Sequence, residues 1–177
     1  MTPTDAASSA PGRPFPGMRE FVVLMAALMA SNALAIDAML PALDEIAFEF
    51  GVAAGNERQL IVSIYLLANG IGALVPGSFA DRFGRKPVIM IALASYAVFS
   101  IVNALVNDFS VMLWARGLQG LLCGGLMVAP IALIRDRYEG DKMARTMSLV
   151  SAVFIIMPVI APSLGQGVML FASWRWI

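Results

Sequence analysis

The sequence predicts an all-α membrane protein, and three observations support this prediction. Of the 177 residues, 59% are hydrophobic and 14% are charged, whereas soluble domains contain about 45–50% apolar and about 25% charged residues. The apolar residues gather into five runs, each about as long as a helix needs to cross the bilayer. These runs do not alternate polar and apolar residues, as the strands of a membrane barrel do. The expected fold is therefore a bundle of membrane-spanning helices.

A short tail precedes the predicted helices. Residues 1–18 are rich in Pro, Ala, Ser and Gly and predict a disordered cytoplasmic tail. Residues 19–177 predict one membrane-spanning unit, and its first apolar run has full spanning length, which argues against a signal peptide. The predicted helices cover about residues 21–43, 60–80, 87–106, 111–134 and 147–171.

Basic residues in the connecting segments predict how the helices are oriented. Nine Lys and Arg residues fall in the tail, between the second and third helices, or between the fourth and fifth. The opposite side carries two, Arg58 and Arg175. Because basic loops stay in the cytoplasm, the N-terminus is predicted to be cytoplasmic. Trp174 and Trp176 fit aromatic anchors at the membrane interface.

Two ionisable residues fall inside predicted spans, Asp37 and Arg116. Both lie about 8–9 Å below the outer surface, as counted along their helices. They are therefore able to share a cavity or form a pair. A charge at such depth is costly, and a functional site is the default interpretation, with a snorkelling side chain or a structural ion pair as the alternative. Since the chain has no His, Asp37 is the natural proton carrier.

Further polar residues accompany these two. Gln119 follows Arg116 by three positions and so shares its helix face. Tyr65 and Asn69 share a face of the second predicted helix, and Asn32 adds an amide to the first. Two interpretations stay open for each: a side chain that lines a cavity, or a plain hydrogen bond between helices.

The connection between the second and third predicted helices has the most specific pattern. Gly84 allows a tight turn, and Pro87 suits the start of a helix. Asp81 follows the end of a helix, where a negative charge is unfavourable without a partner. Arg85 is expected to pair with Asp136, at the end of the fourth helix. The candidate residues of this segment are Gly77, Asp81, Arg82, Gly84, Arg85, Lys86 and Pro87.

This segment resembles the signature of the major facilitator superfamily, Gly-x-Leu-Ala-Asp-Arg-x-Gly-Arg-Arg/Lys-Pro, and departs from it at Phe79. Arg116 to Gly120 resembles the Arg-x-x-Gln-Gly motif of the fourth helix, in which the resemblance implies proton transfer by the Arg. The residues around Pro162 and Gly165 resemble the antiporter motif of the fifth helix, with departures at Ala161 and Gln166.

Two further segments resemble the drug/proton antiporters of the bicyclomycin/chloramphenicol resistance (Bcr/CflA) branch. Pro158 and Pro162 resemble its double-proline version of the fifth-helix motif. Asp37 to Leu43 resembles Asp-x-Tyr-Leu-Pro-Ala-Leu, with Met39 at the Tyr position. The resemblance covers nearly the whole chain, from about residue 19 to residue 177.

The resemblance implies a transporter of twelve helices in two halves, located in a bacterial-type inner membrane. The chain would supply the first five helices, as a fragment, a truncated reading frame or an incomplete record. Asp81, Arg85 and Asp136 would form a cytoplasmic latch, and the fifth-helix glycine and prolines would seal and bend the cavity wall. The expected partners are the lipid bilayer, protons, a small-molecule substrate and the missing C-terminal half.

Three functions remain open at this point. The first is proton-coupled efflux of drug-like molecules, driven by the proton gradient and without a cofactor. The others are uptake of a small metabolite by symport, and a truncation product that transports nothing. No enzyme is expected, because the sequence shows no nucleophile–base pair or phosphate loop. A formal charge of zero gives no reason to expect nucleic acid, and the single Cys123 without any His gives no metal site.

Overall fold

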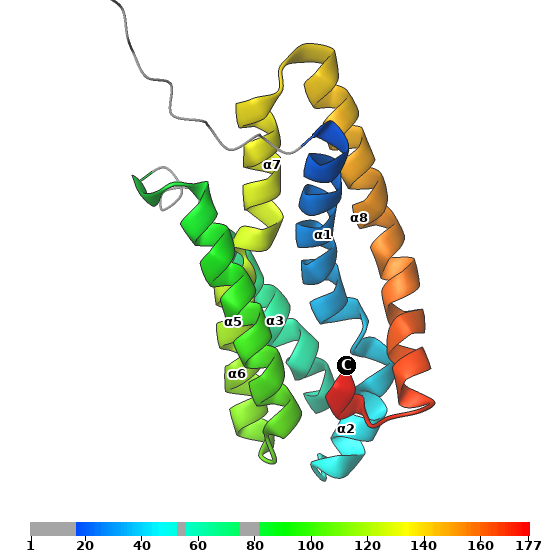
Figure 1. The fold of residues 1–177 in the computed structure, drawn as a ribbon. Helices are drawn as coiled ribbons and strands as arrows, with labels where there is room; N and C mark the ends of the chain where they lie inside the picture. The colour runs from blue at the N-terminus through cyan, green and yellow to red at the C-terminus, as the bar shows by residue number, and fades with distance from the viewer. Residues whose placement is uncertain (1–16, 53–55, 75–81) are drawn as a thin grey trace, which may run out of the picture.

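The computed structural model describes residues 17–52, 56–74 and 82–177, and this part of the chain contains helices and no strand. The all-α prediction is confirmed. The helices are α1 (Met18–Asp37), η1 (Leu40–Ala42), α2 (Leu43–Glu49), α3 (Glu57–Leu74), α5 (Arg85–Leu105), α6 (Phe109–Cys123), α7 (Gly125–Arg137), α8 (Gly140–Met169) and η2 (Trp174–Trp176). The long helices run side by side along the bundle (Figure 1).

Four stretches of the described residues are long and apolar enough to cross a membrane: Met18–Glu49, Arg85–Leu105, Phe109–Arg137 and Gly140–Met169. They correspond to the first, third, fourth and fifth predicted helices. The second predicted helix, residues 60–80, corresponds to α3, and its last six positions lie outside the described residues. The fifth begins at Gly140, seven residues before the prediction, because a polar first turn precedes its apolar part.

Two predicted helices are divided in the structure. The first was expected to continue to residue 43, but α1 ends at Asp37. Pro41, four positions later, has no N–H to donate to the Asp37 carbonyl, and its ring would clash with that carbonyl in a continuous helix. The fourth is divided at Gly124, where α6 meets α7 at two consecutive glycines. Glycine is among the weakest helix formers.

Glycines bring α3 and α6 into close contact, the most extensive helix pairing of the bundle. A Cβ added at Gly124 would lie 2.5 Å from the Ala73 nitrogen, and one at Gly72 would lie 2.8 Å from the Leu121 carbonyl carbon. Small residues that allow backbones to meet are the usual means of helix association in lipid. Cys123, next to Gly124, is buried, and its Sγ lies 3.6 Å from the Ala92 carbonyl oxygen on α5.

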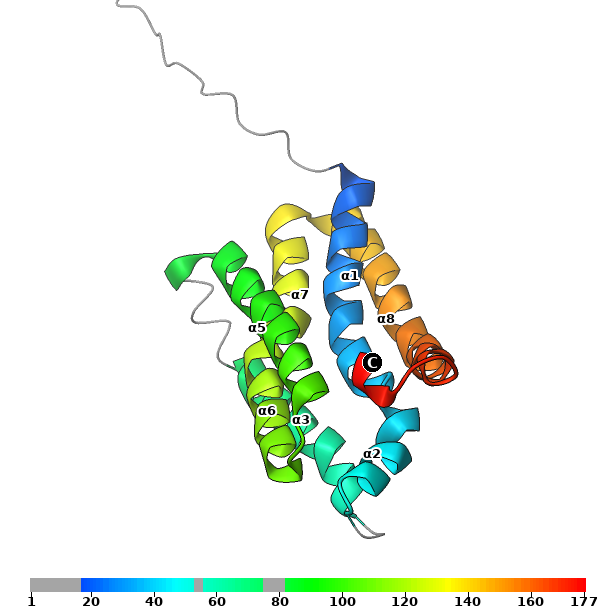
Figure 2. The same ribbon diagram turned by 60° about the horizontal axis from the view of Figure 1, so that its bottom comes forward.

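The interior consists of two apolar clusters. One contains Phe21, Met25, Leu126 and Ile134. The other contains Met39, Ile46, Met112 and Trp174. Figure 2 shows η2 folded back over the end of α1, near α2. The end of the bundle formed by η1, α2 and η2 is called the η2 end below, and the opposite end, where α5 begins, is called the Arg85 end.

Candidate functional site

A layer of polar side chains separates the two apolar clusters. Along α1, α5 and α6 and the residues directly after them, buried polar residues lie between members of the two clusters, and on α3 they follow Ile61 of the second cluster. The layer consists of Asn32, Tyr65, Asn69, Asn103, Arg116 and Gln119, each buried. Five of these six residues were singled out from the sequence. Polar groups at this depth in a membrane helix are costly and are therefore candidates for function.

Arg116 is the one charged member of the layer, and neutral groups surround it. Its Nη1 donates to the Ala35 carbonyl oxygen and to Gln119 Oε1, both at 3.2 Å. Its Nη2 contacts the sulfur of Met39, a weak acceptor. Its side chain is 7% exposed, and Nε has no hydrogen-bond partner. No carboxylate of the described residues forms an ion pair with this guanidinium.

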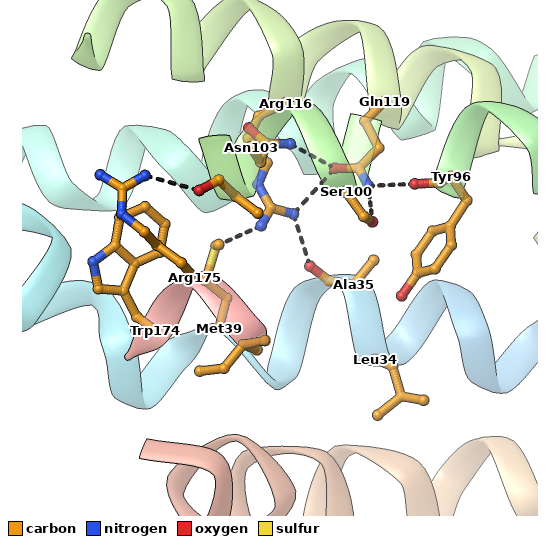
Figure 3. A pocket seen from close by; sticks show the side chains of 12 residues that line it. Leu34, Ala35, Met39, Tyr96, Ser100, Asn103, Arg116, Gln119, Trp174 and Arg175 are labelled. Carbon is orange, nitrogen blue, oxygen red and sulfur yellow. Dashed lines mark hydrogen bonds between the residues drawn. The ribbon is translucent and has the colours of Figure 1, made fainter. Parts of the chain in front are cut away.

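Gln119 links Arg116 to α5 (Figure 3). Its Oε1 also accepts from Asn103 Nδ2 at 3.3 Å. Its Nε2 donates to Ser100 Oγ at 3.1 Å and to the Tyr96 carbonyl oxygen at 3.4 Å. Asn103 and Ser100 were missed by the sequence analysis, although Tyr96, Ser100 and Asn103 recur at the spacing of one helix face. That spacing was the signal that would have found them.

A small cavity of about 30 Å³ lies beside Arg116. Asn103, Gln119 and Ser100 line it from the polar layer, and Trp174 and Arg175 line it from η2. The Oδ1 of Asn103 has no hydrogen-bond partner. The cavity is thus polar on several sides and lies where η2 covers the bundle.

A second group of hydrogen bonds joins α1, α3 and α6. Asn32 Oδ1 accepts from the Tyr65 hydroxyl at 2.9 Å and from Asn69 Nδ2 at 3.0 Å. Asn69 Nδ2 also lies 3.3 Å from the Gly120 carbonyl oxygen. Of the two interpretations left open for these side chains, the structure favours hydrogen bonds between helices.

Asp37 lies apart from this group. Arg116 contacts Ala35 of α1 and Met39 just beyond the end of α1, on either side of Asp37 in sequence. The two charged residues are therefore at the same level, as expected. The carboxylate itself is partly buried, makes no ion pair or hydrogen bond among the described residues and does not line the Arg116 cavity. A helix turns by 100° per residue, which places position 37 on the opposite face of α1 from position 35. The structure does not pair Asp37 with Arg116.

The η2 end is joined by contacts that the sequence analysis missed. Arg175 Nη2 lies 2.6 Å from Glu49 Oε1, and Arg175 Nη1 donates to the Ala104 and Val106 carbonyl oxygens at 2.9 and 2.8 Å. Trp174 donates to Glu49 through Nε1 and is 1% exposed. The anchor position predicted for Trp174 is therefore wrong, because its ring is buried inside the protein. Residues 126 positions apart leave no local signal in the sequence.

At the Arg85 end, the structure joins the two residues that the sequence analysis paired. Arg85 Nε lies 2.6 Å from Asp136 Oδ2, and Nη2 lies 3.3 Å from Oδ1. Gly84 has a φ of 87°, which favours glycine, and Pro87 lies in the first turn of α5. Lys86 and Arg82 are exposed, and Arg82 lies over the Phe83 ring. Gly77 and Asp81 lie outside the described residues.

The fifth-helix residues lie on α8, which continues through both prolines. Pro158 is exposed and Pro162 is partly buried. Gly165 is buried, and a Cβ there would lie 2.9 Å from the carbonyl carbon of Ala38. This glycine therefore lets α8 approach the end of α1 directly beside Asp37.

Comparison with known proteins identifies the family. The sequence model of the Major Facilitator Superfamily matches residues 24–177. The chain belongs to the major facilitator superfamily. It is 33% identical over 158 residues to the Multidrug resistance protein MdtL of Klebsiella pneumoniae subsp. pneumoniae. It is 30% identical over the same length to the protein of that name from Salmonella paratyphi C.

Each alignment covers 89% of this chain and 40% of the relative. This major facilitator chain therefore spans less than half the length of the relatives that it matches.

Proposed function

We propose that the chain forms the N-terminal half-bundle of a transporter that exports drug-like small molecules in exchange for protons. The observation that carries the proposal is its similarity to multidrug resistance proteins of the superfamily over 89% of its length. The buried polar layer supports the proposal, because an inert anchor gains nothing from a costly charge such as Arg116 at this depth. A second half-bundle would supply the other wall of the substrate path.

Asp37 is the proposed proton carrier, with the fifth-helix antiporter motif of α8 beside it. The contact between Gly165 and Ala38 ties α8 to the place where α1 ends, so a movement of α8 would move the backbone next to this carboxylate. The proposed role of Arg116, on α6, is to hold a positive charge at the depth of Asp37 but beside a different face of α1. We place the N-terminus in the cytoplasm of a bacterial-type inner membrane and assign Arg85 and Asp136 to a cytoplasmic latch.

The test is export by a bacterial strain that lacks its main efflux pumps and expresses the complete gene product. We expect at least a fourfold higher inhibitory concentration for some amphipathic cations, and substrate-induced proton release from everted vesicles. Asp37→Asn is expected to abolish both. Asp141→Asn, which makes the same substitution at an exposed position of α8, is expected to leave them unchanged. Equal proton release from the Asp37→Asn protein would refute the assigned role of Asp37.

Uptake by symport is the second candidate, because Ala161 and Gln166 depart from the fifth-helix antiporter motif. Labelled substrate distinguishes the two directions in right-side-out vesicles with an inward proton gradient. Export predicts that the gradient lowers accumulation of the label, whereas symport predicts that it raises accumulation.

A further inference from the structure

Two arginines line the cavity beside the polar layer, and their charges are balanced differently. Arg175 forms an ion pair with Glu49 and also donates to two backbone carbonyls. Arg116 contacts three neutral groups and forms no ion pair with any residue that the structure describes. With Glu49 paired to Arg175, Arg116 is the cavity-lining side chain whose charge is balanced by no other side chain of the described residues.

That charge lies where it is most costly. Apolar clusters flank the polar layer on both sides, and the guanidinium of Arg116 is removed from solvent. A buried cation in a membrane protein is usually paired with an anion or with several backbone carbonyls. Arg116 has one carbonyl, one amide and one sulfur, and its Nε donates to nothing.

The cavity limits the size of a partner. Its volume of about 30 Å³ compares with roughly 10–15 Å³ of the same measure for one water molecule. A monatomic anion fits such a space, whereas a drug-sized molecule, which needs roughly 300 Å³ or more, does not. Asp37 cannot fill it, since its side chain leaves α1 on the opposite face.

From these observations we propose that the cavity between Arg116, Asn103 and η2 binds one small inorganic anion, such as chloride. Arg116 supplies the charge, and Trp174 and Arg175 of η2 cover the site. Ser100, whose hydroxyl oxygen accepts from Gln119 Nε2, also lines the cavity and can donate its own O–H to the ion. The site shares Arg116 with the proposed transport function, but ion binding there does not depend on drug export.

The experiment measures thermal unfolding of the complete gene product, purified in detergent, in sodium chloride and in sodium gluconate at equal ionic strength. An ion that binds the folded state raises the midpoint temperature in a saturable manner. We expect such a rise with chloride and with bromide, and none with acetate or gluconate, which exceed the cavity. An equal midpoint in all four salts would overturn the proposal, and a rise with acetate would assign the cavity to carboxylates instead.

A matched pair of variants localises the effect. Asn103→Asp places a fixed carboxylate in the cavity, so its midpoint is expected to be independent of chloride. Asn56→Asp adds the same charge at an exposed position and is expected to keep the chloride response. A chloride response retained in Asn103→Asp would overturn the assignment to this cavity.

Direct binding provides the second measurement, should Asn103→Asp fail to fold. Labelled chloride is expected to bind the unmodified protein at one site per chain. Arg116→Gln, which keeps a polar side chain of similar reach, is expected to lower that binding at least tenfold. Unchanged binding to Arg116→Gln would show that the ion lies elsewhere.

Discussion

The two ends of the bundle are held by different kinds of contact. At the η2 end, Glu49 accepts hydrogen bonds from Trp174 and Arg175. Arg175 also donates to the carbonyl oxygens of Ala104, in the last turn of α5, and Val106, just after it. At the Arg85 end, an ion pair whose Arg85 and Asp136 side chains are 25% and 53% exposed joins α5 to α7, and the rings of Phe21 and Tyr138 meet edge to face. Exposed ion pairs contribute little to stability, whereas a buried aromatic ring contributes several kcal/mol. We therefore expect the ion pair at the Arg85 end to contribute less to stability than the contacts of Trp174 and Arg175 at the η2 end.

The largest effect is expected from Trp174→Ala, because the ring of Trp174 is 1% exposed. Loss of a buried Trp lowers the free energy of unfolding by about 3–5 kcal/mol. Denaturation in mixed detergent micelles measures this change in the free energy of unfolding. Trp176→Ala serves as the control, since Trp176 is 79% exposed and its loss is expected to change stability by less than about 0.5 kcal/mol. Similar losses for both tryptophans would contradict the burial of η2.

Gly165→Ala comes next. The added methyl group would meet the backbone of Ala38, which cannot move aside as a side chain does, and we expect a loss of about 1–3 kcal/mol. Nothing lies within 4 Å of a Cβ at Gly167, so Gly167→Ala is expected to stabilise the helix by up to about 1 kcal/mol. The same denaturation assay compares the two variants, and we expect Gly165→Ala to lower the free energy of unfolding and Gly167→Ala to raise it.

Glu49→Gln should cost about 1 kcal/mol. The amide oxygen can still accept from Trp174, but the ion pair with Arg175 is lost, and the Glu49 side chain is 42% exposed to solvent. The loss is expected to shrink at high salt, which screens the original pair. Glu45→Gln removes a charge from the same helix without touching η2 and is the control. A loss independent of salt would indicate that the hydrogen bonds alone hold Arg175.

The smallest effect is expected at the Arg85 end. Asp136→Asn should lower the free energy of unfolding by at most about 0.5 kcal/mol, because the Asp136 side chain is 53% exposed and water screens the pair. A double-mutant cycle with Arg85→Gln measures the coupling between the two side chains. A coupling above about 2 kcal/mol would remove the proposed difference between the ends.

Local patterns in the sequence were enough to predict the helices and several contacts of this structure. Apolar run length predicted the helices, and the turn before α5 predicted both the glycine conformation at Gly84 and a partner for Arg85. The spacing of Arg116 and Gln119 predicted their shared helix face, and the two side chains are hydrogen-bonded.

What the sequence did not reveal depends on contacts between distant segments. The pairing of Glu49 with Arg175 joins residues 126 positions apart in the sequence, and each alone is an ordinary charged residue beside a span. Equal depth suggested a pair between Asp37 and Arg116, but depth along a helix says nothing about direction around it. The end of α1 at Asp37 was predictable from Pro41, because the effect of a proline on the carbonyl four positions earlier is local.

The lone cysteine has a practical consequence for measuring motion. Cys123 is 0% exposed, and its thiol lies within the contact of α6 with α5. A maleimide or nitroxide reagent is therefore not expected to reach it in the folded state, so these 177 residues contribute an unlabelled background. Pairs of cysteines introduced at exposed sites, one near η2 and one near the first turn of α5, can carry spectroscopic probes without replacing Cys123. The separation between such probes would report directly which end opens when substrate or protons are added.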